Sequence, residues 1–168
     1  MSAASKPVYF ERERGVSQVE VTPGIAHFSV RFAEAEAEVQ ARRLELLQTL
    51  AAGNVPVFMV KIEPGALCFA IRQESVDAGE EILKQRGHDF EVRRDLALLT
   101  VLAGAMRDLS GVMARIYEAL VGQGIPVRQT GDAYNAVQCL VDGGGAARGA
   151  DALRAQFQIE NGEGGAPS

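Results

Sequence analysis

Residues 50–57 read LAAGNVPV, and residues 120–127 give the same pattern as LVGQGIPV. The two stretches lie 70 positions apart, so that Leu50 aligns with Leu120. The match continues without a gap through four further pairs of apolar residues: Leu67 and Val137, Phe69 and Cys139, Ile71 and Val141, and Leu83 and Leu153. A period of this length is a whole small domain rather than a solenoid repeat. The sequence therefore predicts two copies of one module, with a seam between them of the kind that often binds small ligands.

The composition of the chain limits its possible functions. The 168 residues include 17 Lys and Arg against 22 Asp and Glu, which gives a formal net charge of −5. Scattered charges with a mildly acidic sum provide no electrostatic footprint for nucleic acid or for an anionic membrane. No apolar run reaches the roughly 20 residues that span a bilayer, and the polar N-terminal stretch lacks the apolar core of a signal peptide. We therefore expect a cytoplasmic protein that binds neither nucleic acid nor membrane.

The reactive side chains form no pattern that indicates catalysis or metal binding. Cys68 and Cys139 are too few for a disulfide framework and lack the close spacing of paired metal ligands. His27 and His88 lie far apart and have no partner pattern. We interpret the cysteines as small buried residues and the histidines as surface or strand residues. No cofactor is expected, and the protein is predicted not to be an enzyme.

Local patterns divide the chain into segments. Residues 1–15 are predicted to be a disordered leader and residues 161–168 a disordered tail. Alternating strands and Ala/Leu-rich helical stripes give the order β-α-β-β-α-β over residues 25–94, and the same order starts again over residues 95–160. Each copy is therefore predicted to be a ferredoxin-like module, an α+β arrangement with helices on one face of an antiparallel sheet.

The two predicted modules are interleaved. The second copy lacks its last strand, because only Ile159 and Glu160 follow its second helix before the tail. An extra strand, residues 16–21, precedes the first copy and is followed by the turn residues Thr22-Pro23-Gly24. We expect residues 16–24 to complete the second module, so that the first module is inserted into the second.

The stretch DLALLTVLAGAMRDLSGVMARIYEALVGQGIPVRQ, residues 95–129, resembles the last ACT domain of aspartokinases. In that family a buried strand leads to Gly-Met-Arg, a short loop and a helix close to Ala-Arg-Ile-hydrophobic-x-Ala-Leu. The matching residues here are Met106-Arg107, Ala114-Arg115-Ile116 and Glu118-Ala119-Leu120. The resemblance covers residues 16–158 and implies a tandem of ACT modules like the regulatory half of an aspartokinase, with the kinase domain absent.

The resemblance also implies a ligand site. In ACT domains a free amino acid lies at the seam between paired modules, held by the loop before the first helix and by the start of the second strand. The matching positions are Met106, Arg107, Asp108, Leu109, Ser110, Gly111 and Val112 in the loop, and Ile125, Val127 and Gln129 in the strand. A helix N-terminus favours a carboxylate, Gly111 permits close backbone approach, and Asp108 can accept hydrogen bonds from an ammonium group. The alternative is that Asp108 or Ser110 only caps the helix.

The chain departs from the family pattern at two places. Pro56 and Pro126 stand where the family often has asparagine, and proline has no donor. In the first module, residues 38–41 replace the loop, have no glycine and lie in a helix-favouring run, so this module is expected to have lost its site. Two functions remain open. One is a non-catalytic, homodimeric regulator that binds a small amino acid and changes its association or conformation. The alternative is an interaction subunit that binds a separate enzyme, such as a kinase, and no ligand.

Overall fold

The structure, a computed structural model, describes residues 15–104 and 109–159. Its elements in chain order are β1 (Val16–Arg31), α1 (Glu36–Ala52), β2 (Phe58–Glu63), β3 (Ala66–Arg72), α2 (Val76–Gln85), β4 (Asp89–Ala103), α3 (Leu109–Gly122), β5 (Gln129–Ala133), β6 (Ala136–Asp142) and α4 (Ala146–Phe157). The predicted α+β class is confirmed. None of the described helices is long and apolar enough to cross a membrane.

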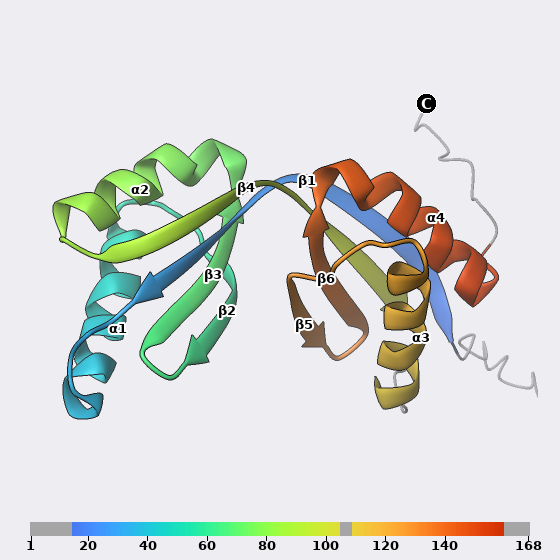
Figure 1. The fold of residues 1–168 in the computed structure, drawn as a ribbon, viewed down its shortest axis with the longest axis horizontal. Coiled ribbons are helices and arrows are strands. Elements are labelled where there is room, and N and C mark those ends of the chain that lie inside the picture. Colours follow the sequence, from blue (N-terminus) through green and yellow to red (C-terminus); the bar gives the residue numbers. More distant parts are fainter. Residues whose placement is uncertain (1–14, 105–108, 160–168) are drawn as a thin grey trace, which may run out of the picture.

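The strands form one antiparallel sheet in the order β2-β3-β1-β4-β6-β5. Figure 1 shows two lobes, one with α1 and α2 and the other with α3 and α4, and both β1 and β4 run from one lobe into the other. We call the lobe with α1 and α2, residues 25–94, the first half. The second half contains α3 and α4 and comprises residues 16–24 and the described residues from 95 to 159.

The long strand β1 serves both halves. Its residues 16–22 pair with residues 98–103 of β4, and these belong to the second half. Its residues 25–31 pair with β3 on one side and with residues 89–96 of β4 on the other. Each half therefore has four strands in the order of a ferredoxin-like module, with one strand contributed by β1 and one by β4.

The predicted turn at Thr22-Pro23-Gly24 is wrong, because β1 continues through it as one strand of 16 residues. The strands predicted on either side of Asp95 are likewise one strand, β4. The chain bends at both places instead of reversing, since Gly24 has φ +70° and Asp95 has φ +56°. These two bends occupy equivalent places, because the residues that follow them, Ile25 and Leu96, pair with each other.

The sequence predicts strands that start at Val55 and Ile125, but β2 and β5 begin later, because the preceding residues finish a helix. Asn54 and Gly124 adopt left-handed conformations with φ of 54° and 66°. The amide of Val55 then donates to the Leu50 carbonyl at 2.9 Å, and Ile125 makes the matching bond at 2.9 Å. This is the Schellman arrangement that closes a helix C-terminus. The amides predicted to start the two strands are thus used to cap α1 and α3.

Each half has its own apolar core between its helices and its sheet. The aligned residues of the repeat are buried in both cores: Leu50 and Leu120, Val55 and Ile125, Leu67 and Val137, Phe69 and Cys139, Ile71 and Val141, and Leu83 and Leu153. A third cluster, which we call the junction cluster, lies where the halves meet and consists of Ile25, Ala70, Leu96, Leu98 and Leu140, with Phe58 and Met59 packed against it. Apolar residues that lie 70 positions apart in the sequence therefore occupy equivalent positions in the two cores.

Candidate functional site at the start of α3 and the junction

The structure describes the predicted ligand loop in part. Met106, Arg107 and Asp108 lie outside the described residues. Helix α3 begins at Leu109, one residue before the predicted cap Ser110, and the side chains of both residues are outside the described set. Gly111 follows in the same turn, and Val112 is half-buried against the core of the second half. A helix N-terminus therefore lies within one residue of the predicted position.

The three strand residues of the predicted site have different environments. Ile125 is 3% exposed, and its Cγ1 lies 3.4 Å from where a Cβ on Gly145 would stand, so that it packs beneath the start of α4. Val127 packs against the same core. Both side chains therefore contribute to the core of the second half. Gln129 is half-buried and reaches the junction between the halves.

Gln129 joins the two halves through hydrogen bonds of its side chain. Its Nε2 donates to the backbone carbonyl of Met59 on β2, and its Oε1 lies 2.8 Å from Nε2 of His27 on β1. Because a carbonyl only accepts, the orientation of the Gln129 amide is fixed, and Nε2 of His27 must donate to Oε1. No local pattern in the sequence indicates a partner for His27. Its partner lies 102 residues away along the chain, at a distance that no local pattern reveals.

The Met59 carbonyl is available to Gln129 because β2 is irregular there. The register of β2 against β3 shifts between Phe58 and Lys61, and Met59 has φ +50°. A left-handed conformation costs a residue with a side chain about 1 kcal/mol. Met59 and Gln129 are also aligned in the repeat, since they are 70 residues apart. The contact therefore joins equivalent positions of the two halves, and the repeat in the sequence already identifies these positions as equivalent.

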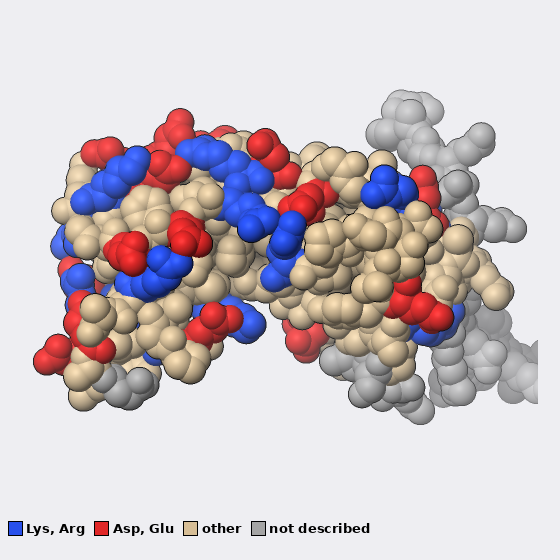
Figure 2. All heavy atoms as spheres, in the orientation of Figure 1, with Lys and Arg blue, Asp and Glu red and all other residues tan. Residues whose placement is uncertain are grey.

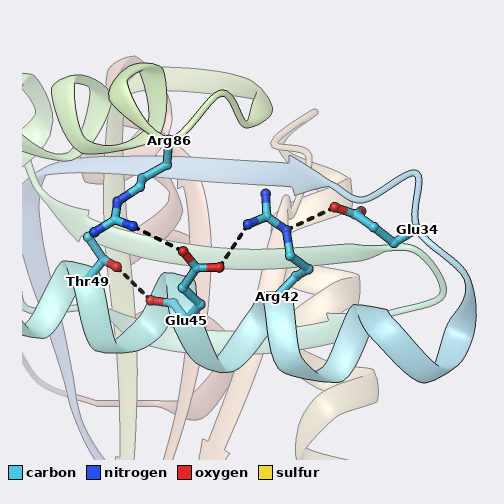
Figure 3. Close-up of polar contacts among 5 residues, drawn as sticks. All are labelled: Glu34, Arg42, Glu45, Thr49 and Arg86. Carbon is cyan, nitrogen blue, oxygen red and sulfur yellow. Dashed lines mark hydrogen bonds and ion pairs between the residues drawn. The ribbon is translucent and has the colours of Figure 1, made fainter.

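In the first half, ion pairs occupy the region that corresponds to the predicted loop. Residues 38–41 lie inside α1, which confirms the predicted helix. Arg42 binds Glu34 at 2.9 Å and Glu45 at 2.8 Å, and Glu45 also binds Arg86 at 3.1 Å (Figure 3). The pKa of the Glu34 carboxyl is lowered by a hydrogen bond from its own backbone amide and by Arg42. The polar groups of this region are thus satisfied by one another.

A cavity of about 370 Å³ adjoins these ion pairs, with Phe32, Glu34, Arg42 and His88 in its lining. The ring of His88 packs edge-on against Phe32, with 5.8 Å between the ring centroids. Burial lowers the pKa of His88 and so favours the neutral imidazole. Arg42 is paired with both Glu34 and Glu45, so none of these three residues offers an unpaired charge to a molecule in the cavity.

The cysteines lie where the sequence analysis expects them. Cys68 and Cys139 are free and buried, and burial raises the pKa of Cys139 to about 12. A thiol with such a pKa stays protonated at neutral pH and is a poor nucleophile. Within residues 15–104 and 109–159, no group of three or more His, Cys, Asp or Glu side chains is placed to hold a metal ion.

Comparison with known proteins agrees with the resemblance seen in the sequence. No family model matches the chain. Aspartokinase 1 of Bacillus subtilis is 22% identical over 147 residues, which are 88% of this chain and 36% of the length of that enzyme. The chain therefore spans about a third of that relative.

Solved structures of aspartokinase regulatory regions have the same fold. The ligand-free regulatory subunit of aspartate kinase from Thermus thermophilus has a TM-score of 0.75 at 16% identity, over 86% of this chain and 99% of that subunit. Aspartokinase III of E. coli in complex with lysine and aspartate has a TM-score of 0.69 at 16% identity, over 88% of this chain and 34% of that enzyme. The resemblance to the regulatory half of aspartokinases is thus confirmed, and the interleaved arrangement of two ferredoxin-like halves is shared.

Proposed function

We propose that the chain is a non-catalytic regulatory module that binds a small amino acid at the start of α3 and thereby changes its conformation or association. The observation that carries this proposal is the shared fold, which matches an aspartate kinase regulatory subunit over nearly the whole of that subunit. A similar protein, E. coli aspartokinase III, has been solved with lysine and aspartate bound. A regulatory role with an amino acid as its signal is the function that these likenesses support.

The physical chemistry of the start of α3 suits an amino acid. The positive end of the helix dipole lies at the N-terminus of a helix and attracts a carboxylate. Gly111 in this turn has no side chain to block a ligand. In our proposal the carboxylate of Asp108 accepts hydrogen bonds from the ammonium group of the ligand. In the same proposal, Met106, Arg107, Leu109, Ser110 and Val112 complete the lining.

Binding can affect the whole chain because the halves share their strands. A ligand that binds one arrangement more tightly shifts the population toward it, and such couplings are typically worth about 1–3 kcal/mol. Since β1 and β4 each run through both halves, a change at α3 is transmitted to the junction. We expect a homodimer whose dissociation constant changes with the ligand, which analytical ultracentrifugation with and without amino acids would measure.

The alternative function is an interaction subunit that binds a separate enzyme and no ligand. It is favoured by Pro56 and Pro126, which offer no backbone donor where a ligand would need one. The similar protein from Thermus thermophilus is itself called a regulatory subunit. Affinity capture from native extract would support this alternative if an enzyme were retained and no amino acid changed the melting temperature.

The test of the leading proposal is a thermal-shift screen of the twenty amino acids at millimolar concentration. A ligand that binds only the native state must raise the melting temperature. Asp108→Ala should abolish the effect without unfolding the protein. The matched control is Asp132→Ala, which removes an exposed carboxylate on β5 of the same half and should leave the effect unchanged. Equal affinity of the Asp108→Ala variant and the native protein would reject the site.

A further inference from the structure

A cavity of about 420 Å³ lies on the face of the sheet opposite the helices of the first half. In β1 the side chains of Phe28 and Val30 enter the core beneath the helices, so the alternate residues His27 and Ser29 point to the other face. The cavity also reaches the second half, because one of its residues precedes β5. It is lined by His27, Ser29, Glu91, Val92, Arg93 and Arg128. A molecule bound here would touch both halves.

The charged groups of the cavity leave one cation without a partner. Glu91 is paired with Arg31. Arg128 makes a bidentate contact with Asp142, at 3.2 Å from Nε and 2.7 Å from Nη2, and this contact lowers the pKa of Asp142. Arg93 makes no hydrogen bond or ion pair with any residue that the structure describes. Asp89 also pairs with Arg31, and the charge of Arg93 acts on Asp142, so the cluster as a whole is balanced. The guanidinium donors of Arg93 still have no hydrogen-bond acceptor among the described residues and are available to an anion.

The cavity offers further donors beside Arg93. The thiol of Cys68 donates to Oγ of Ser29 at 3.6 Å. The hydroxyl hydrogen of Ser29 has no acceptor among the described residues and is available to a ligand. His27 lies across the strand pair from Arg93, and its hydrogen bond to Gln129 fixes the ring. Donors without acceptors are the arrangement that an oxyanion requires.

The repeat shows that the fold does not require these polar residues. Leu98 pairs with Thr22 on the opposite side of the junction, at the place equivalent to the pair of His27 and Arg93. Leu98 belongs to the apolar junction cluster. Phe58 is the residue aligned with Arg128, and it packs against the same cluster. At one of the two equivalent places the cations are therefore replaced by the uncharged residues Thr22 and Phe58, so the fold itself does not require Arg93 and Arg128.

We propose that this cavity binds a small oxyanion, a carboxylate or a phosphate, which Arg93, Arg128 and the hydroxyl of Ser29 hold between the two halves. This site is separate from the amino acid site proposed at the start of α3, and it does not depend on that site. An anion in this position ties Arg128 of the second half to β1 and β4 of the first half. It therefore stabilises the same arrangement of the two halves as the hydrogen bonds of Gln129.

The proposal is tested by the melting temperature of the full chain in increasing sodium phosphate and, separately, sodium succinate, at constant ionic strength maintained with sodium chloride. We expect a saturable rise with at least one of the two anions, and the responding anion identifies the chemical class. Arg93→Gln should weaken the apparent affinity about tenfold or more, the loss expected for one charge-assisted hydrogen bond. The control Arg148→Gln removes an exposed arginine of α4 and should leave the response intact.

A second variant addresses the fold directly. His27→Leu combined with Arg128→Phe gives the cavity the apolar residues of its equivalent place, so the protein should remain folded and lose the response. Asp108→Ala should leave the response to anions unchanged, which separates this site from the amino acid site. Equal responses of Arg93→Gln and Arg148→Gln, or no saturable response to either anion, would overturn the proposal.

Discussion

The cores of the two halves are built at aligned positions of the repeat, whereas the contacts between their helices differ. In the first half, Glu45 on α1 binds Arg86 beyond α2 at 3.1 Å. At the aligned positions of the second half, Arg115 on α3 donates to the backbone carbonyl of Gln156 on α4 at 2.6 Å. Arg115 also lies over the ring of Phe157, 4.4 Å from its centroid. The contact between the two helices is kept, but the ion pair is replaced by a backbone hydrogen bond and a stacked cation.

This difference indicates that the halves are specialised. Charged side chains are prominent on the first half in the view of Figure 2, whereas much of the same face of the second half is uncharged. Arg42, which connects Glu34 and Glu45 in the first half, aligns with the half-buried Val112 in the second. The start of α1 thus carries ion pairs on the surface, whereas the aligned residue of α3 packs against the core of the second half.

The largest contrast between the halves should lie in their cores. Phe69 is fully buried and stacks on Phe28 with 5.4 Å between the ring centroids. Phe69→Ala should lower the free energy of unfolding by about 3–5 kcal/mol. The aligned Cys139 is equally buried but small, and Cys139→Ala should cost about 1 kcal/mol. Urea denaturation of both variants measures the difference, and equal losses would show that the two cores are not organised as described.

The glycines that bring α2 and α4 close to the sheet should respond in different ways. A Cβ on Gly149 would lie 3.0 Å from Leu99, 3.1 Å from Leu120 and 3.2 Å from Ile125. Gly149→Ala should therefore destabilise the protein by about 1 kcal/mol, because crowding exceeds the gain in helix propensity. The nearest contact at Gly79 would be 3.3 Å, and Gly79→Ala should be neutral within about 0.5 kcal/mol. Differential scanning calorimetry of both variants measures the two losses, and a larger loss for Gly79→Ala than for Gly149→Ala would contradict the prediction.

The two bends of the long strands provide a test of backbone strain. A Cβ on Gly24 would meet its nearest neighbour, Cβ of Gln73, at 3.8 Å, so a side chain has space there. Gly24→Asp should cost about 1 kcal/mol, from the left-handed conformation alone. Asp95→Gly removes the same strain, but it raises the conformational entropy of the unfolded chain. The two contributions to the free energy of unfolding should cancel within about 0.5 kcal/mol. A loss above 1 kcal/mol for Asp95→Gly in chemical denaturation would assign the Asp95 side chain a structural role.

The surface contacts between helices should also give small effects. Arg86 and Glu45 are 51% and 43% exposed, so Arg86→Ala should cost less than about 0.5 kcal/mol. Arg115→Ala loses a hydrogen bond and a cation–ring contact and should cost about 1 kcal/mol. Thermal unfolding of the Arg86→Ala and Arg115→Ala variants in low and high salt measures both effects, because salt screens an exposed ion pair. A larger effect for Arg86 would mean that the ion pairs of the first half are more than a surface feature.

The repeat made the cores predictable from the sequence, because aligned apolar residues such as Ile71 and Val141 are buried in both halves. The continuity of β1 was not predictable, since Pro23-Gly24 has the composition of a turn and its conformation depends on pairing with β4. The later starts of β2 and β5 depend on helix caps that require three-dimensional geometry. Of the candidate site, the sequence predicted the helix start to within one residue, whereas the hydrogen bond between His27 and Gln129 depends on a contact between distant residues.

Hydrogen–deuterium exchange of the full chain, with and without a mixture of the twenty amino acids at millimolar concentration, tests the central claim most directly. If the second half alone has kept a ligand site, the amino acids should slow exchange at residues 109–112 in the first turn of α3. Exchange at residues 36–39, the first turn of α1, should not change. Protection at α1, or no protection in either helix, would contradict the account.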